Sequence, residues 1–337
     1  MNGISIHSGY CRAIGLSIWS LDRDVATRAE CEEIVNYEET ARLATEAFAS
    51  PNPVILPERL RWFYERCFSA GTTVIALRDG DRKVGQIAMV RQAFRVDGKE
   101  ESAAQLVDLF ISREFRGKER LQQLYAEVER QFVKQDIRFA IGMPNAKALG
   151  VNEHFFSLKP FLRLPLSMGI AIPLPPPNDL ISFRFDPSDK NHVLALFAGY
   201  IGSAEENGVI WDETKLFERL CGYKREYGIH ALDDVLLISS PRISRGMTYT
   251  LLCGFLTCRG VEAPPIVVRH LVRDACRLWK RPLFAYAGVN SKLSAPPGIV
   301  MPAKLRPSPL LVQLRDFKPA RPPLRLDRFQ FLDFDLA

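Results

Sequence analysis

The stretch from Leu106 to Asn145 constrains the fold most, because its pattern predicts a strand, a tight turn, a helix and a second strand. Residues 107–111 (VDLFI) are apolar apart from Asp108, which is typical of a buried strand. From Lys118 onward apolar residues recur at spacings of three and four, at Leu121, Leu124, Tyr125, Val128 and Phe132. That period indicates a helix with one buried face. The turn at 116–118 therefore leads from a strand into a helix N-terminus.

A helix N-terminus at this position predicts an anion site. The first amides of a helix have no acceptor within it, and the helix dipole is positive there. A phosphate or pyrophosphate is thus the expected ligand of Arg116, Gly117, Lys118, Glu119, Arg120 and Leu121. Gly117 lets the backbone approach such a ligand closely. The alternative is that Arg116 to Lys118 form an ordinary solvated turn before a helix.

The order of elements around this turn resembles that of the GNAT (Gcn5-related N-acetyltransferase) superfamily, whose motif here reads roughly Arg/Gln-x-x-Gly-x-Gly/Ala. We expect helices at 38–48, 58–68, 118–132 and 146–158, and strands at 72–77, 83–94, 106–111, 137–142 and 162–172. This order is similar to the β-α-α-β-β-β-α-β-α-β order of the superfamily. With Arg116 in the first motif position, Glu119 and Leu121 replace the two small residues, and Gly117 alone relieves crowding around the phosphates.

The length of 337 residues is enough for two cores. The proline-rich run from Pro173 to Asp179 cannot continue a helix or a central strand, so it divides the chain. Beyond it the order of strand, turn, helix (266–279) and strand recurs, and Asn290 falls where Asn145 does. We therefore predict an α+β fold with a mixed α/β sheet. Its parts are an accessory segment at 1–32, a GNAT domain with the acyl-CoA site at 33–173, a linker at 174–180, and a second, degenerate GNAT-like domain at 181–337.

The second copy lacks the features of an anion site. Glu262-Ala263-Pro264-Pro265 opens its helix, and there two prolines remove backbone donors while an acid replaces the basic residue. We expect this copy to be structural or to shape the acceptor pocket.

Composition excludes several classes of function. The net charge of +6 is spread along the chain, so we expect no nucleic-acid partner. The apolar run from Ala13 to Leu21 is too short to span a bilayer, so we expect no membrane partner. The seven cysteines follow no disulfide framework, which favours a reducing cytoplasm. Cys253 and Cys258 would point to opposite faces of a strand, so we expect buried thiols and no metal. An oligomer is compatible with the sequence.

The resemblance implies a co-substrate and the residues that hold it. The co-substrate would be acetyl-CoA or another acyl-CoA, and the acceptor an amine on a small molecule or a peptide. Amides near Leu109, Phe110 and Ile111 would pair with the pantetheine arm and polarise the thioester. The amides after Arg116 would hold the pyrophosphate. Asn145 would contact the cofactor, although a helix N-cap also explains an Asn at this place.

Two residues are candidate bases for acyl transfer. Asp108 is the lone acid in its strand, where burial would raise its pKa toward neutrality; a hydrogen-bonded or solvent-facing structural role is the alternative. His154 is the second candidate, with core packing as its alternative. Phe156 occupies the position where family members commonly place a tyrosine acid, and phenylalanine has no proton to donate.

These features predict an N-acyltransferase that works by direct attack of the amine within a ternary complex. The alternative is a non-catalytic acyl-CoA-binding or interaction protein that keeps the fold.

Overall fold

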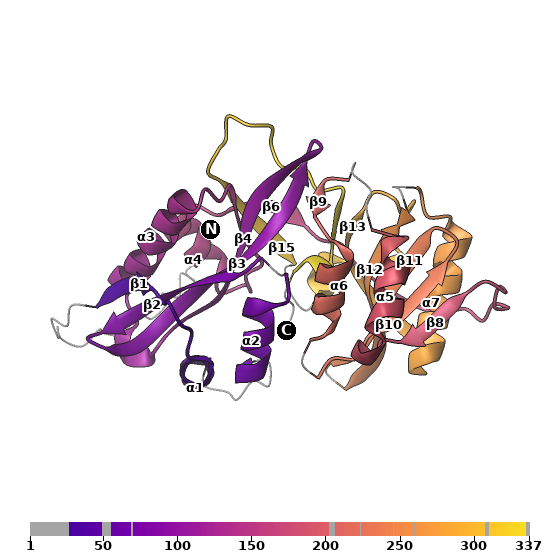
Figure 1. Cartoon of the computed structure of the whole chain (residues 1–337), viewed down its shortest axis with the longest axis horizontal. Helices are drawn as coiled ribbons and strands as arrows, with labels where there is room; N and C mark the ends of the chain where they lie inside the picture. Colours follow the sequence, from indigo (N-terminus) through magenta and orange to yellow (C-terminus); the bar gives the residue numbers. More distant parts are fainter. Residues whose placement is uncertain are drawn as a thin grey trace, which may run out of the picture.

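The computed structural model describes residues 27–48, 55–68, 70–201, 206–222, 224–244, 246–258, 261–306 and 310–334. Two α/β halves lie side by side and are connected by one continuous path of hydrogen-bonded strands (Figure 1). Residues 1–26 of the expected accessory segment lie outside the described residues. The rest of that segment contains β1 (Arg28–Cys31), which pairs antiparallel with β2 (Thr72–Asp79) and so extends the first sheet.

The first half follows the predicted order of elements. After β1 come α1 (Tyr37–Phe48), α2 (Pro57–Glu65), β2, β3 (Arg82–Val96), β4 (Lys99–Ile111), α3 (Lys118–Lys134), β5 (Phe139–Gly142) and α4 (Leu149–Phe156). Side chains alternate along β3, so that Ile87 packs in the cluster that contains α3 and Ala88 in the cluster that contains α2. Thus α3 and α4 cover one face of the sheet, and α1 and α2 the other (Figure 1). The predicted helix at 146–158 is shorter than expected.

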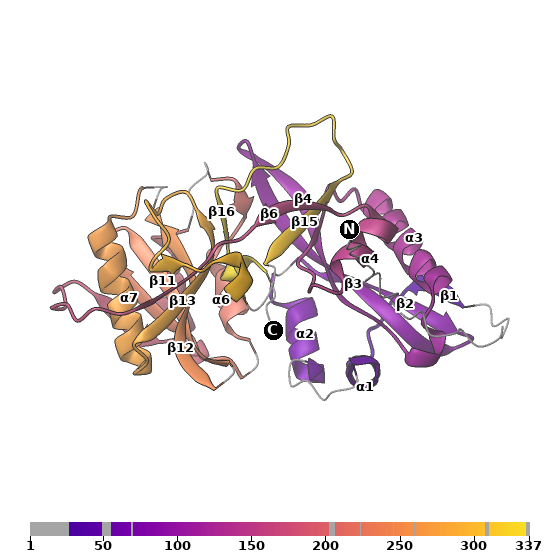
Figure 2. The same cartoon turned by 180° about the vertical axis from the view of Figure 1, so that it is seen from behind.

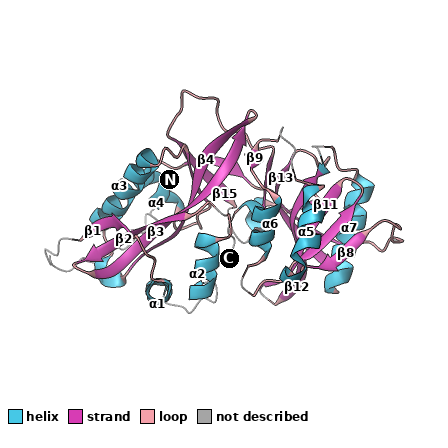
Figure 3. Cartoon of the chain, in the orientation of Figure 1, coloured by secondary structure: helices cyan, strands magenta, loops and turns pink. Residues whose placement is uncertain are grey.

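The second half repeats much of this order. It contains β8 (Ile181–Arg184), α5 (Lys190–Ala198), β9 (Gly208–Val209), α6 (Glu213–Leu220), β10 (Gly228–Leu232), β11 (Val235–Ser244), β12 (Met247–Thr257), α7 (Pro265–Trp279) and β13 (Leu283–Asn290). The helix α6 ends at Leu220, and the strand β10 follows it. Helices again lie on both sides of the strands (Figure 3). None of the described helices is both long and apolar enough to cross a membrane.

The two halves exchange strands. We expected one strand at 162–172, but the chain forms β6 (Lys159–Arg163) and β7 (Leu166–Ile170), and β7 pairs with β13 of the second half. In return β15 (Leu311–Asp316), from near the C-terminus, pairs with both β5 and β6 (Figure 2). The single-strand prediction was wrong because Pro165 lacks the amide donor that a continuous central strand needs. The division into domains at 33–173 and 181–337 stays a prediction.

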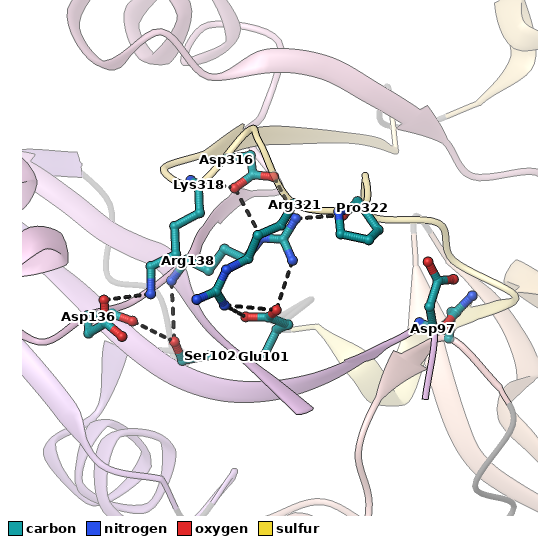
Figure 4. A network of polar contacts seen from close by, with 10 residues as sticks. Asp97, Glu101, Ser102, Asp136, Arg138, Asp316, Lys318, Arg321 and Pro322 are labelled. Atoms are coloured by element: carbon teal, nitrogen blue, oxygen red, sulfur yellow. Dashed lines mark hydrogen bonds and ion pairs between the residues drawn. The ribbon is translucent and has the colours of Figure 1, made fainter. Parts of the chain in front are cut away.

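A buried ionic network fixes the exchanged strand (Figure 4). The Arg138 side chain, 1% exposed, donates two hydrogen bonds to the Asp316 carboxylate at 3.2 and 3.0 Å and one to Glu101 at 3.0 Å. It also donates to the carbonyl of Pro322 at 2.6 Å and lies over the Phe139 ring. The Arg138 guanidinium is buried, and the carboxylates of Asp316 and Glu101 compensate its charge. These contacts hold the end of β15 and the segment after it against the first half.

Of the two cysteines expected to be buried thiols, only Cys253 is fully buried. Cys253 is fully buried, and burial raises the pKa of its thiol to about 11. Cys258, just beyond the strand, is half-buried.

Candidate functional site

The strands β4 and β5 run parallel and then separate. Their pairing runs from Ala103↔Phe139 to Leu106↔Gly142, whereas β4 continues beside β3 as far as Ile111. A bulge at Asp108, whose φ is +51°, accompanies the separation. On the β5 side, no described strand forms a ladder with β4 beyond Leu106. The main chain of Leu109, which also has no partner in the β3 ladder, is available to an extended ligand.

The helix α3 begins next to this gap. Gly117 is its N-cap, and the first helical hydrogen bond runs from the Leu121 amide to the Gly117 carbonyl at 3.2 Å. Within the described chain, no acceptor is recorded for the amides of Gly117, Lys118, Glu119 and Arg120. Four donors are thus present at the positive end of a helix, which is the usual geometry of an anion site.

The side chains around these amides also suit an anion. Glu119 is 79% exposed and approaches only Arg120, at 3.6 Å. The buried Nε of Arg120 makes no hydrogen bond to any described residue. Arg116 instead holds the loop, because it donates to the carbonyls of Ile111 (3.1 Å) and Ala47. Free amides and an orphaned guanidinium donor fit a diphosphate.

Gly117 is not required by backbone conformation. Its φ of −179° is extended and open to any residue. A Cβ there would contact only the Arg120 side chain, at 3.6 Å. The fold therefore does not require glycine at this position.

Asp108 lies at the end of a chain of buried polar groups. The Tyr64 hydroxyl donates to the Asp108 carboxylate at 2.7 Å, and the Gln86 side-chain amide donates to Tyr64 at 3.0 Å. The chain continues through Thr40 to Lys83, whose ammonium also pairs with Glu32 at 2.6 Å. Burial and the nearby Asp108 charge raise the pKa of Tyr64 well above its ordinary value, so Tyr64 stays a neutral donor. Sequence reasoning missed Tyr64, because nothing in the α2 pattern distinguishes it from a core tyrosine.

The other predicted residues lie apart from Asp108. His154 is exposed on α4, on the face opposite to α2, and its recorded ring contact is with Phe155. Phe156 is 1% exposed and packs against Tyr125 and Phe132 in the core. The Asn145 side chain accepts from the amides of Lys147 and Ala148 at 3.0 Å each, which is a turn-capping role.

The corresponding gap of the second half is filled by the chain itself. Pairing between β12 and β13 stops at Leu252↔Tyr286, and β16 (Arg328–Gln330) then pairs with the end of β13. The Gln330 side-chain amide accepts from the Phe255 amide at 2.9 Å and donates to its carbonyl at 3.0 Å. The second gap is closed.

The start of α7 is also unlike that of α3. Pro264 is the N-cap and Pro265 the first helical residue, so neither position has an amide to donate. The Ala263 amide donates to the Lys292 carbonyl at 2.8 Å. The start of α7 therefore lacks the two amide donors that Gly117 and Lys118 provide at the start of α3.

Comparisons with known proteins agree with this geometry. Residues 33–150 match the family model of the acetyltransferase (GNAT) domain. A probable N-acyltransferase from Enterococcus faecalis superposes with a TM-score of 0.59 at 13% identity, over 86% of this chain and 72% of that one. A GCN5-related N-acetyltransferase from Kribbella flavida superposes with a TM-score of 0.58 at 13% identity, over 88% of this chain and 73% of that one.

A longer superposition is found with the N-myristoyltransferase of Saccharomyces cerevisiae, solved with bound myristoyl-CoA. Its TM-score is 0.52 at 14% identity, over 94% of this chain and 85% of that one. No curated protein matches the chain by sequence. At such identities the likeness to solved structures shows the fold.

Proposed function

We propose that the chain is an N-acyltransferase of the GNAT superfamily that takes its acyl group from acyl-CoA, because residues 33–150 match the model of that domain. The observation that carries the proposal is the gap between β4 and β5, which ends at the free amides of α3. The second half, closed by Gln330, has no comparable site in its described residues. The active site therefore belongs to the first half.

The binding role falls to the main chain. The amides of residues 117–120, with the Arg120 guanidinium, hold the diphosphate of CoA at the positive end of α3. The main chain of Leu109, at the gap between β4 and β5, pairs with the pantetheine arm. Amides of Leu109 to Ile111 then polarise the thioester carbonyl and stabilise the oxyanion that forms on attack. Acyl-CoA supplies the activated acyl group, and we propose acetyl as that group.

The chemical step uses Asp108. The acceptor amine attacks the thioester carbon, and the Asp108 carboxylate takes the proton that the amine loses. The Tyr64 hydroxyl, donating to Asp108 at 2.7 Å, orients the carboxylate. The C–S bond then breaks, and the thiolate takes a proton from water, because Phe156 lies in the core and has none to give. We place the amine, on a small molecule or a peptide, where the two halves meet.

Proline at the first helical position tests the binding role. Lys118→Pro removes one free amide and suits both a helix start and the extended Gly117 before it, so folding is retained. Gly117→Pro is less informative, because a proline ring cannot adopt a φ of −179°. We expect Lys118→Pro to weaken acetyl-CoA binding about tenfold or more in calorimetric titration.

The matched control is Lys118→Ala, which removes the same charge and keeps the amide. It should lose less affinity than Lys118→Pro. Equal affinities for the two variants would show that this amide does not bind the diphosphate.

The core position of Phe156 favours a second candidate, a protein that binds acyl-CoA without turnover. Thiol release measured with several acyl-CoAs and a panel of amines distinguishes the two. Turnover on any amine supports the enzyme, whereas binding without thiol release supports the second candidate.

A further inference from the structure

The helix α7 lies at the outer edge of the second half (Figure 2). An apolar groove runs along it. Its volume is about 670 Å³, and its walls come from the end of β7, one side of α7 and the loop after β13. The apolar side chains that line it include Ile170, Ile172, Val268, Val272 and Ile299. Ile172 and Ile299 are 70% and 78% exposed. Size and lining are those of a site for an apolar ligand.

A basic pocket of about 390 Å³ adjoins this groove. The two share Ala171 and Leu174 as walls, so one continues into the other. Four cationic residues line the basic pocket, and its lining contains no acid; they are Arg273, Arg277, Lys280 and Arg281. Because the carbonyl end of α7 repels anions, these cations supply the attraction for one.

Arg273 is the buried cation of the basic pocket. It is 8% exposed, and one of its nitrogens donates to the Leu174 carbonyl. Its Nε and its other terminal nitrogen make no hydrogen bond to any residue that the structure describes. The nearest carboxylate, Asp274, is 3.7 Å away and pairs with Arg277 at 2.7 Å. A buried guanidinium with two unused nitrogens is costly unless an anion completes it.

The groove and the basic pocket lie along neighbouring rows of side chains on α7. Val268 and Val272 are one helical turn apart, and Arg269, Arg273 and Arg277 form the neighbouring row. A straight alkyl chain in the groove would therefore place a head group beside Arg273. We propose that this face binds an amphipathic anion, a single alkyl chain with a carboxylate or phosphate head.

The proposal is independent of the acyl-CoA site. Calorimetric titration of the full chain with dodecanoate and with dodecyl phosphate, below their micelle concentrations, tests it. Binding of either head supports the proposal, and the comparison identifies which head is preferred. Decanoate should bind about tenfold more weakly than dodecanoate, because two buried methylene groups are lost. Dodecyltrimethylammonium, with the same chain and a cationic head, should not bind at this face.

Two pairs of variants assign the binding to this face. Arg273→Met should lower the affinity for dodecanoate about tenfold or more, and Arg273→Lys should lower it less. Ile172→Glu places a charge in the groove and should abolish binding, whereas Ile243→Glu, at an isoleucine of similar exposure outside it, should not. Lys118→Pro should leave dodecanoate affinity unchanged.

A further variant protects the test against misfolding of Arg273→Met. Lys280 has a φ of +53°, so Lys280→Gly removes a cation in a conformation that glycine prefers. This substitution should lower the affinity for dodecanoate about threefold. No heat with either ligand would overturn the proposal. So would affinities that neither Ile172→Glu nor Lys280→Gly changes.

Discussion

At the scale of the residue, Asp108 has two roles: it provides a carboxylate, and it forms the bulge of β4. Only the first role is visible in the sequence. As the lone acid of the apolar run 107–111, Asp108 is visible from the pattern, but its φ of +51° also makes it the bulge residue, a conformation that Asp tolerates well. Donors run from Lys83 through Thr40, Gln86 and Tyr64 toward its carboxylate, and they hold this side chain in place. Charge and conformation can therefore be separated by substitution.

Asp108→Asn keeps a residue that tolerates this φ and removes the charge. We expect kcat to fall about 100-fold or more while acetyl-CoA affinity stays the same, because the general base is lost. Steady-state kinetics and calorimetric titration measure the two quantities. His154→Gln is the comparison and should change kcat far less. An Asp108→Asn enzyme with unchanged kcat would assign Asp108 to the bulge alone.

At the scale of the element, the sequence predicted most helices and strands of both halves but not which strands pair. Periodicity fixes the face that a strand buries, so the strands predicted at 72–77 and 83–94 were found. Partner choice depends on contacts between distant segments. The pairing of β15 with β5 and β6 depends on Arg138 and Asp316, which are 178 positions apart. The Tyr64 contact with Asp108, between α2 and β4, was hidden for the same reason.

The Arg138 network makes the strand exchange testable. Arg138→Met keeps a side chain of similar length but leaves Asp316 and Glu101 without their shared cation. Loss of one partner from a buried ion pair costs about 3–5 kcal/mol of unfolding free energy. Denaturant unfolding measures the change. Arg42→Ala, which removes an exposed pair with Glu46, is the control and should cost about 0.5 kcal/mol or less. A similar small cost for Arg138→Met would mean that this network does not hold β15.

At the scale of the molecule, the two halves differ at the place where neighbouring strands separate. The gap of the first half opens onto free amides, whereas Gln330 fills the gap of the second. The C-terminal segment that brings Gln330 is held by the buried Arg219, which donates to the carbonyls of Leu332 (3.0 Å) and Phe334 (2.9 Å) and lies over Trp62 of α2. One segment thus closes the second site and joins the halves.

A crystal structure of the protein with coenzyme A tests the central claim most directly. We predict one CoA per chain, with its diphosphate within hydrogen-bond distance of the amides of residues 117–120 and its pantetheine arm beside residues 107–111. A diphosphate bound at the start of α7, or anywhere away from the start of α3, would contradict the account.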